Sequence, residues 1–127
     1  MSKKIIFTIT VLYWIFAFTM THIPSRTVPH VNISDKIEHY LGYGFLAGAL
    51  FVSLHLSGKR DVGIKVLMIL MAYGAIDEWT QALPFINRSC EFADWCADCA
   101  GIATAVGTLT LFTWIAPRVV LNTSRRN

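Results

Sequence analysis

The fold is decided by residues 62–83, VGIKVLMILMAYGAIDEWTQAL, an apolar run that carries two adjacent carboxylates near its end. A helix that crosses a bilayer needs about 20 mostly apolar residues, and this run has that length. Asp77 and Glu78 precede its last few residues, so a spanning helix would hold them below the headgroups. An isolated carboxylate at that depth costs at least ~2–3 kcal/mol, so the pair indicates partners on neighbouring helices.

Three further apolar runs occupy residues 5–23, 37–56 and 94–115. The four runs close at residues that break or cap helices: Pro24, Ser57-Gly58, Pro84 and Pro117. The chain is 54% hydrophobic and 15% charged, whereas a soluble domain carries about a quarter charged residues. We therefore predict an all-α polytopic membrane protein, a single domain over residues 1–127 in which four transmembrane helices pack as a small bundle.

The distribution of Lys and Arg predicts the orientation of this bundle. Eight cations flank the N-terminus, the loop between the second and third runs, and the C-terminus: Lys3, Lys4, Lys59, Arg60, Lys65, Arg118, Arg125 and Arg126. Three flank the other two loops: Arg26, Lys36 and Arg88. The positive-inside rule then places both termini in the cytoplasm. The first run is long for a signal peptide and lacks a small-x-small cleavage site, which favours an uncleaved helix.

The outward ends of the runs hold seven of the eight acidic residues: Asp35, Glu38, Asp77, Glu78, Glu91, Asp94 and Asp98. Residues three or four apart share a helix face, so Asp94, Asp98 and Gly101 form one stripe, and Asp77 and Gln81 form another. We expect three helices to present acidic or amide groups at one depth, facing the interior of the bundle.

Helix capping competes with a functional role at some of these positions. Asp35-x-x-Glu38 resembles a capping box in which Ser34 is a rival cap. Asp94 and Asp98 lie in the first turns of their helix, where its dipole stabilises anions. Neither explanation covers Asp77 and Glu78, which lie near the C-terminal end of theirs. These two carboxylates are therefore the strongest candidates for a functional or site-organising role.

Three cations complete the candidate site. Arg88 lies in a short loop between the acids of the third and fourth runs, and its planar fork can bind two carboxylates or a phosphate. Lys36 and His39 stand one turn apart at the start of the second run. The other histidines, His22, His30 and His55, are expected to have no comparable acidic neighbours.

Small residues provide further structural candidates. Gly44-x-x-x-Gly48 and Ala97-x-x-x-Gly101 allow close helix packing, although glycine is also simply common in membrane spans. Cys90, Cys96 and Cys99 are interpreted as small packing residues, since no second ligand pair accompanies the C-x-x-C spacing. A disulfide on an oxidising side of the membrane is compatible but not required.

Three of these motifs together resemble the VanZ family of small bacterial membrane proteins. They are Asp35-Lys36-x-x-His39, Asp77-Glu78-x-x-Gln81, and Arg88 followed by Asp94, Asp98 and Gly101. Asp98 stands where the family commonly has asparagine, which raises the local negative charge. The resemblance spans about residues 35–107 and implies the bacterial inner membrane, a cell-envelope role, and a link to glycopeptide (teicoplanin) resistance. It implies no specific reaction.

Three functions follow as hypotheses. The first is a non-enzymatic protein whose outward polar pocket binds a lipid headgroup, a cell-wall precursor or an amphiphilic drug such as a lipoglycopeptide. The second is a hydrolase or transferase in which a divalent metal at His39, Asp77, Glu78 and Asp98 activates water. The third is a proton-coupled transporter that uses the same side chains as a relay.

Partners follow from charge and composition. We expect membrane lipid as a partner, and an oligomer is compatible with the sequence. We expect no resident cofactor or metal. The formal charge of +3 is too small to argue for nucleic acid as a partner.

Overall fold

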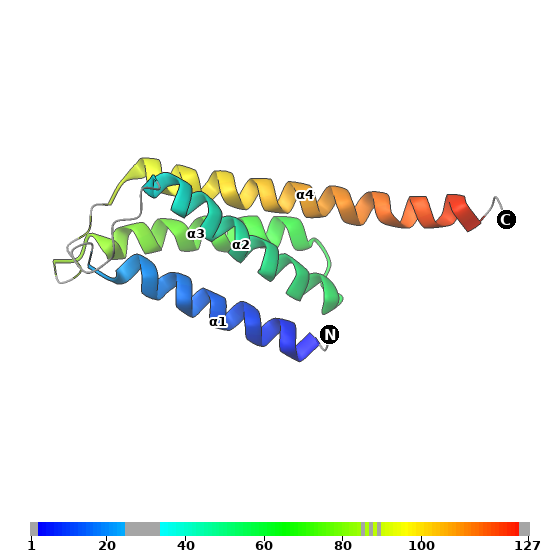
Figure 1. The fold of residues 1–127 in the computed structure, drawn as a ribbon, viewed down its shortest axis with the longest axis horizontal. Helices are drawn as coiled ribbons and strands as arrows, with labels where there is room; N and C mark the ends of the chain where they lie inside the picture. The colour runs from blue at the N-terminus through cyan, green and yellow to red at the C-terminus, as the bar shows by residue number, and fades with distance from the viewer. Residues whose placement is uncertain (1–2, 25–33, 85, 87, 89, 125–127) are drawn as a thin grey trace.

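Four helices make up the computed structural model, which describes residues 3–24, 34–84, 86, 88 and 90–124, with side chains as far as 116. They are α1 (Lys3–His22), α2 (Asp35–Leu56), α3 (Val62–Gln81) and α4 (Phe92–Ser124), and no strand occurs among these residues. Successive helices run in opposite directions, so the start of α1 and the end of α4 lie toward the same end of the bundle (Figure 1). The predicted all-α class is confirmed for the described part of the chain. Arg26, Arg125 and Arg126 of the charge count, and His30, lie outside it.

Three of the four helices are long and apolar enough to cross a membrane: Lys3–His22, Asp35–Leu56 and, within α4, Phe92–Ala116. The fourth, α3, is 20 residues long but carries Lys65, Asp77 and Glu78. Large apolar side chains face outward from the bundle; Phe45, Met68 and Phe112 are 67%, 68% and 68% exposed. Contiguous exposed apolar surface on this scale is rare on soluble monomers and is expected where lipid is the solvent.

The buried core lies between α2, α3 and α4. Leu46, Leu70 and Ile102, one from each helix, are fully buried at its centre. α1 is more peripheral, and Thr10 is its one buried residue. The Thr10 hydroxyl donates to the carbonyl oxygen of Ala49 at 3.2 Å, a polar contact that fastens α1 to α2 where apolar burial is scarce.

The closest helix contact is between α2 and α4, at Gly44 and Gly101. A Cβ added to Gly101 would collide with the carbonyl oxygen of Tyr40, and one added to Gly44 would lie 3.5 Å from the carbonyl oxygen of Gly101. The predicted packing role is therefore supported at these two positions. It is not supported at Gly48, one turn further along the same face, where an added Cβ meets nothing within 4 Å.

The helix ends differ from the apolar runs that predicted them. α1, α2 and α4 each begin two residues earlier than predicted. The added residues of α1 and α2 are charged, because a helix can extend beyond its apolar, lipid-facing length. α3 ends at Gln81, two residues early. α2 ends as predicted, with Gly58 in the left-handed region at φ 73°. The predicted end of α4 at Pro117 is wrong, since the helix continues to Ser124. Proline removes only one helical hydrogen bond and can bend a helix without ending it.

Candidate functional site

Three helices bring a histidine and two carboxylates together at one end of the bundle. His39 Nδ1, from the first turn of α2, lies 2.9 Å from Asp98 Oδ1 of α4 and 3.6 Å from Glu78 Oε1 of α3. Their side chains are only 6%, 1% and 4% exposed. Buried ionisable groups persist where they are paired, and this pairing joins residues from all three motifs of the sequence.

Gln81 connects this group to Asp77. Its side-chain amide donates to Asp77 Oδ2 at 3.1 Å and to Glu78 Oε1 at 3.3 Å. Both acids and the glutamine are at most 3% exposed. The adjacent carboxylates of α3, which would repel each other in isolation, therefore share a donor one turn further along the same helix. The predicted placement of Gln81 beside Asp77 on one helix face is observed.

α1 also contributes to the site, which the sequence analysis did not predict. The Thr21 hydroxyl donates to Asp77 Oδ1 at 3.2 Å, and His22 Nδ1 lies 3.7 Å from the same oxygen. The prediction that His22 lacks acidic neighbours is thus wrong. The contact depends on how α1 packs against α3, and the sequence offered only one hint: two polar residues at the outward end of the first apolar run.

These contacts form one continuous set of side chains, which we name the polar network: His22, Asp77, Gln81, Glu78, His39 and Asp98. It draws on all four helices, and each consecutive pair lies within 3.7 Å. Apolar side chains lie on its inner side, since the fully buried Leu46, Leu70 and Ile102 lie one to two turns closer to the other end of the bundle. The ionisable layer is therefore separate from the apolar core along the bundle axis.

Lys36 binds two acids beside the network. Its Nζ donates to Asp94 Oδ1 at 3.1 Å and to Glu91 Oε2 at 3.3 Å. Asp94 is only 3% exposed. Glu91 also donates its backbone N–H to Glu78 Oε2 at 3.2 Å. The start of α4 is thus tied to the first turn of α2 and to the end of α3.

Arg88 lies elsewhere than predicted. Its guanidinium donates to the carbonyl oxygens of Met20 and Ile23 at 3.2 and 3.5 Å and lies 3.8 Å from Asp35 Oδ1. It is therefore not the counter-ion of the acids of α3 and α4. The carbonyl groups at the C-terminal end of a helix attract cations, and the end of α1 supplies this partner.

Glu38 and Asp35 do not join the polar network. Glu38 is exposed, and the side chain of Asp35 is 51% exposed. The capping box is not formed: Ser34 occupies the N-cap position without a side-chain cap, and its carbonyl oxygen accepts from the backbone N–H groups of Ile37 and Glu38.

Two buried oxygens have no hydrogen-bond partner among the described residues: Asp98 Oδ2 and the Tyr43 hydroxyl. Asp98 is fully buried, and a Cβ placed on Gly74 would meet its Oδ2 at 3.4 Å and the Tyr43 ring at 3.4 Å. Leaving a buried charged oxygen unsatisfied is costly, and such groups call for a physical explanation.

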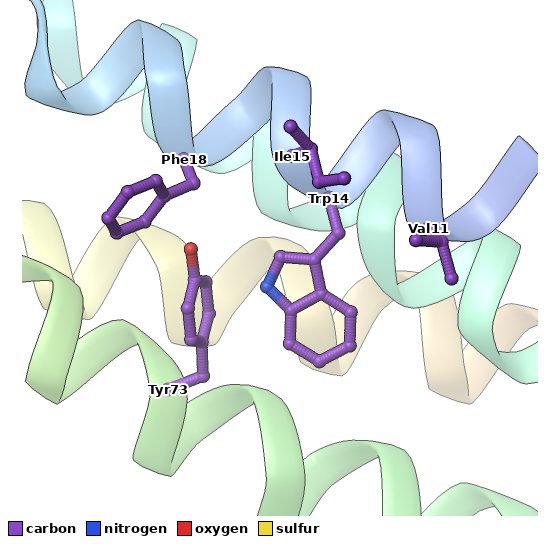
Figure 2. A pocket seen from close by; sticks show the side chains of 5 residues that line it. All are labelled: Val11, Trp14, Ile15, Phe18 and Tyr73. Carbon is purple, nitrogen blue, oxygen red and sulfur yellow. The ribbon is translucent and has the colours of Figure 1, made fainter.

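An apolar groove opens beside the network, between α1 and α3. It is lined by Val11, Trp14, Ile15, Phe18 and Tyr73 and has a volume of about 280 Å³ (Figure 2). The Tyr73 hydroxyl donates to Asp77 Oδ1 at 3.4 Å, and the Phe18 ring stacks on that of His22 at 4.0 Å. Two lining residues thus contact the polar network directly, which makes the whole site amphipathic.

Metal ligation is geometrically open to two groups of side chains. His39, Glu78 and Asp98 form one and Asp35, His39 and Asp94 the other; the potential ligand atoms of each group lie within 4.8 Å of one another. Asp77, which the sequence placed with the first group, bonds instead to Thr21, Tyr73 and Gln81. The cysteines are free: Cys90 and Cys96 are exposed and Cys99 is half-buried. The first two are therefore not packing residues.

No family model, curated protein or solved structure matches this chain. The function must therefore be argued from the arrangement of its own side chains.

Proposed function

We propose that the chain is a multi-pass protein of the bacterial inner membrane, with four spanning helices, both termini in the cytoplasm and the polar network at the outward end. Two observations support a span for α3 despite its charges. Asp77 and Glu78 are buried inside the bundle and bonded, so they are not exposed to lipid. The start of α1 and the end of α4 lie toward the same end of the bundle (Figure 1), as an even number of spans requires.

The topology can be tested with native Cys90, which is exposed near the start of α4. In a variant with Cys96→Ser and Cys99→Ser, a membrane-impermeant maleimide should label Cys90 in spheroplasts. A matched variant that also carries Cys90→Ser and Ser57→Cys, in the turn after α2, should be labelled only after permeabilisation. The reverse pattern would contradict the orientation.

The function we propose is binding of an envelope amphiphile, whose polar headgroup meets the network while its apolar part lies in the groove. The observation that carries this proposal is the contact between Tyr73 in the groove and Asp77 in the network. Ligand sites commonly combine an apolar cavity with a few convergent polar groups. The VanZ-like motifs support an envelope lipid, a cell-wall precursor or a lipoglycopeptide such as teicoplanin as the class of ligand.

The layering of the bundle favours binding over proton-coupled transport. A relay would need polar groups through both halves of the membrane. The described interior beyond the network is instead filled by Leu46, Leu70, Ile102 and Val66, all fully buried. Beyond the network the buried polar side chains include the hydroxyls of Thr10 and Ser53, whereas the buried carboxylates and histidine are confined to the depth at which a headgroup would enter from the outer leaflet.

Filling the groove should weaken amphiphile binding. Ile15 lines the groove and is 58% exposed, whereas Ile9 on the same helix is 50% exposed and lies outside the lining. If a tryptophan in place of Ile15 displaces a part of the ligand that is as large as one apolar side chain, the lost burial costs about 1.5–3 kcal/mol. This corresponds to about a tenfold or greater loss of affinity. Ile15→Trp should weaken binding of short-chain phosphatidylglycerol or teicoplanin by about that factor in native mass spectrometry. Ile9→Trp is the control, and equal affinities in the two variants would contradict the proposal.

A further inference from the structure

We propose that His39 Nδ1, Glu78 Oε1 and Asp98 Oδ1 bind a divalent cation, Mn²⁺ or Mg²⁺, at the centre of the polar network. The inference deepens the proposed function and rests on it only for the role of the ion. A bound cation would give an acidic cluster the positive charge that a phosphate-bearing headgroup needs. Metal binding itself can be measured without any amphiphile.

The separations between the three atoms fit a common ion. Nδ1 lies 2.9 Å from Asp98 Oδ1 and 3.6 Å from Glu78 Oε1. Around an octahedral ion with bonds of about 2.1 Å, neighbouring ligand atoms stand about 3 Å apart. The three side chains come from three helices, and their potential ligand atoms all lie within 4.8 Å of one another. One imidazole with two carboxylates suits Mn²⁺ or Mg²⁺ better than a structural zinc site, which prefers thiolates and several histidines.

The unpartnered oxygen of Asp98 is an independent observation that points to a ligand. Asp98 is fully buried and its Oδ2 has no hydrogen-bond partner among the described residues, while its Oδ1 contacts His39. A cation bound on Oδ1 would supply a partner for the second oxygen as well, through a water that the ion retains or through chelation, since carboxylates bind ions through one or both oxygens. An isolated His–Asp pair leaves that oxygen unexplained.

Charge balance points the same way. The buried carboxylates at this end are Asp77, Glu78, Asp94 and Asp98. Of the two fixed cations nearby, Lys36 is bound by Asp94 and Glu91, and Arg88 lies against the end of α1. His39 is left as the group shared by Glu78 and Asp98. A divalent ion in place of the Nδ1 proton would compensate two carboxylates at once, and binding would release that proton.

The test is a Mn²⁺ titration of the full-length chain in detergent, followed by electron paramagnetic resonance. The expected result is one tightly bound Mn²⁺ per chain with a ¹⁴N coupling from the histidine in spin-echo modulation. Asp98→Asn should weaken binding at least about tenfold, because even a second-shell change costs 10–100-fold. Glu38→Gln, an exposed acid on the same turn as His39, is the control expected to stay within about twofold.

Several outcomes would overturn the inference. They are the absence of saturable Mn²⁺ binding, unchanged Mn²⁺ affinity in a folded Asp98→Asn protein, and the absence of the nitrogen coupling. Loss of Mn²⁺ binding in Asp94→Asn alone would also overturn it, because the ion would then lie on the group Asp35, His39 and Asp94. If Asp98→Asn does not fold, Glu78→Gln replaces it in the same comparison. Loss of Mn²⁺ binding with intact amphiphile binding would reject the ion site and leave the proposed function standing. Bound Mn²⁺ with no amphiphile binding would do the reverse.

Discussion

Replacing Gly101 by alanine is expected to destabilise the bundle by at least about 2 kcal/mol, the upper part of the usual range for overpacking. The added Cβ would collide with the carbonyl oxygen of Tyr40, a backbone atom that no side-chain rotation can move. α2 and α4 would have to separate along their closest contact. Because His39 and Asp98 lie about one turn from this contact on the two helices, their 2.9 Å approach would be lost as well.

The measurement is the midpoint of unfolding in detergent, compared with Gly48→Ala. Gly48 lies on the same helix as Gly44, and an added Cβ there meets nothing within 4 Å. The control should not destabilise the protein and should stabilise it by up to about 1 kcal/mol, because alanine is the better helix former. Equal stability of the two variants would show that α2 and α4 do not approach each other at Gly101.

Replacing His39 by leucine is expected to have the second large effect, a loss of about 3–5 kcal/mol. Removing one member of a buried ion pair leaves its partner buried and uncompensated, and this accounts for the size of the loss. Here two carboxylates would be stranded, since Nδ1 lies 2.9 Å from Asp98 and 3.6 Å from Glu78.

Glu38→Leu is the matched control, because Glu38 is the exposed neighbour of His39 on the same helix. Its loss in the same unfolding assay should stay below about 0.5 kcal/mol. Comparable losses at the two positions would mean that His39 is not paired in the folded protein.

The helices were predictable from the sequence because an apolar run of about 20 residues has the length of a helix that crosses a bilayer. Each apolar run became a helix. The starts of α1 and α2 were placed too late because charged residues extend these helices ahead of their apolar runs, whereas α3 ends before its apolar run does. Pro117 was mistaken for an end because proline weakens a helix locally but does not forbid it. Three helices meet the length and composition of a membrane span, and α3 does not. Whether α3 crosses the membrane therefore depends on the neighbouring helices that bury its charged side chains.

The candidate site was predictable only where sequence spacing fixes geometry. Asp77 and Gln81, four apart on one helix, had to share a face, and they are bonded. The partners of His22 and Arg88 depend instead on how α1 packs against the other helices, and no spacing within one helix contains that information. The contact between Tyr73 and Asp77 could have been predicted, since the two residues are four apart on one helix. An aromatic side chain at that position is, however, equally typical of the apolar core.

The central claim is that polar groups from separate helices are paired inside the bundle, and a double-mutant cycle between His39 and Asp98 tests it most directly. Unfolding free energies are measured for His39→Leu, Asp98→Leu and the double variant. We expect the double variant to lose about 1–3 kcal/mol less than the sum of the single losses, because each single change strands a buried partner that the double change removes. Losses that add within about 0.3 kcal/mol would mean that the two side chains do not interact, and would contradict the account.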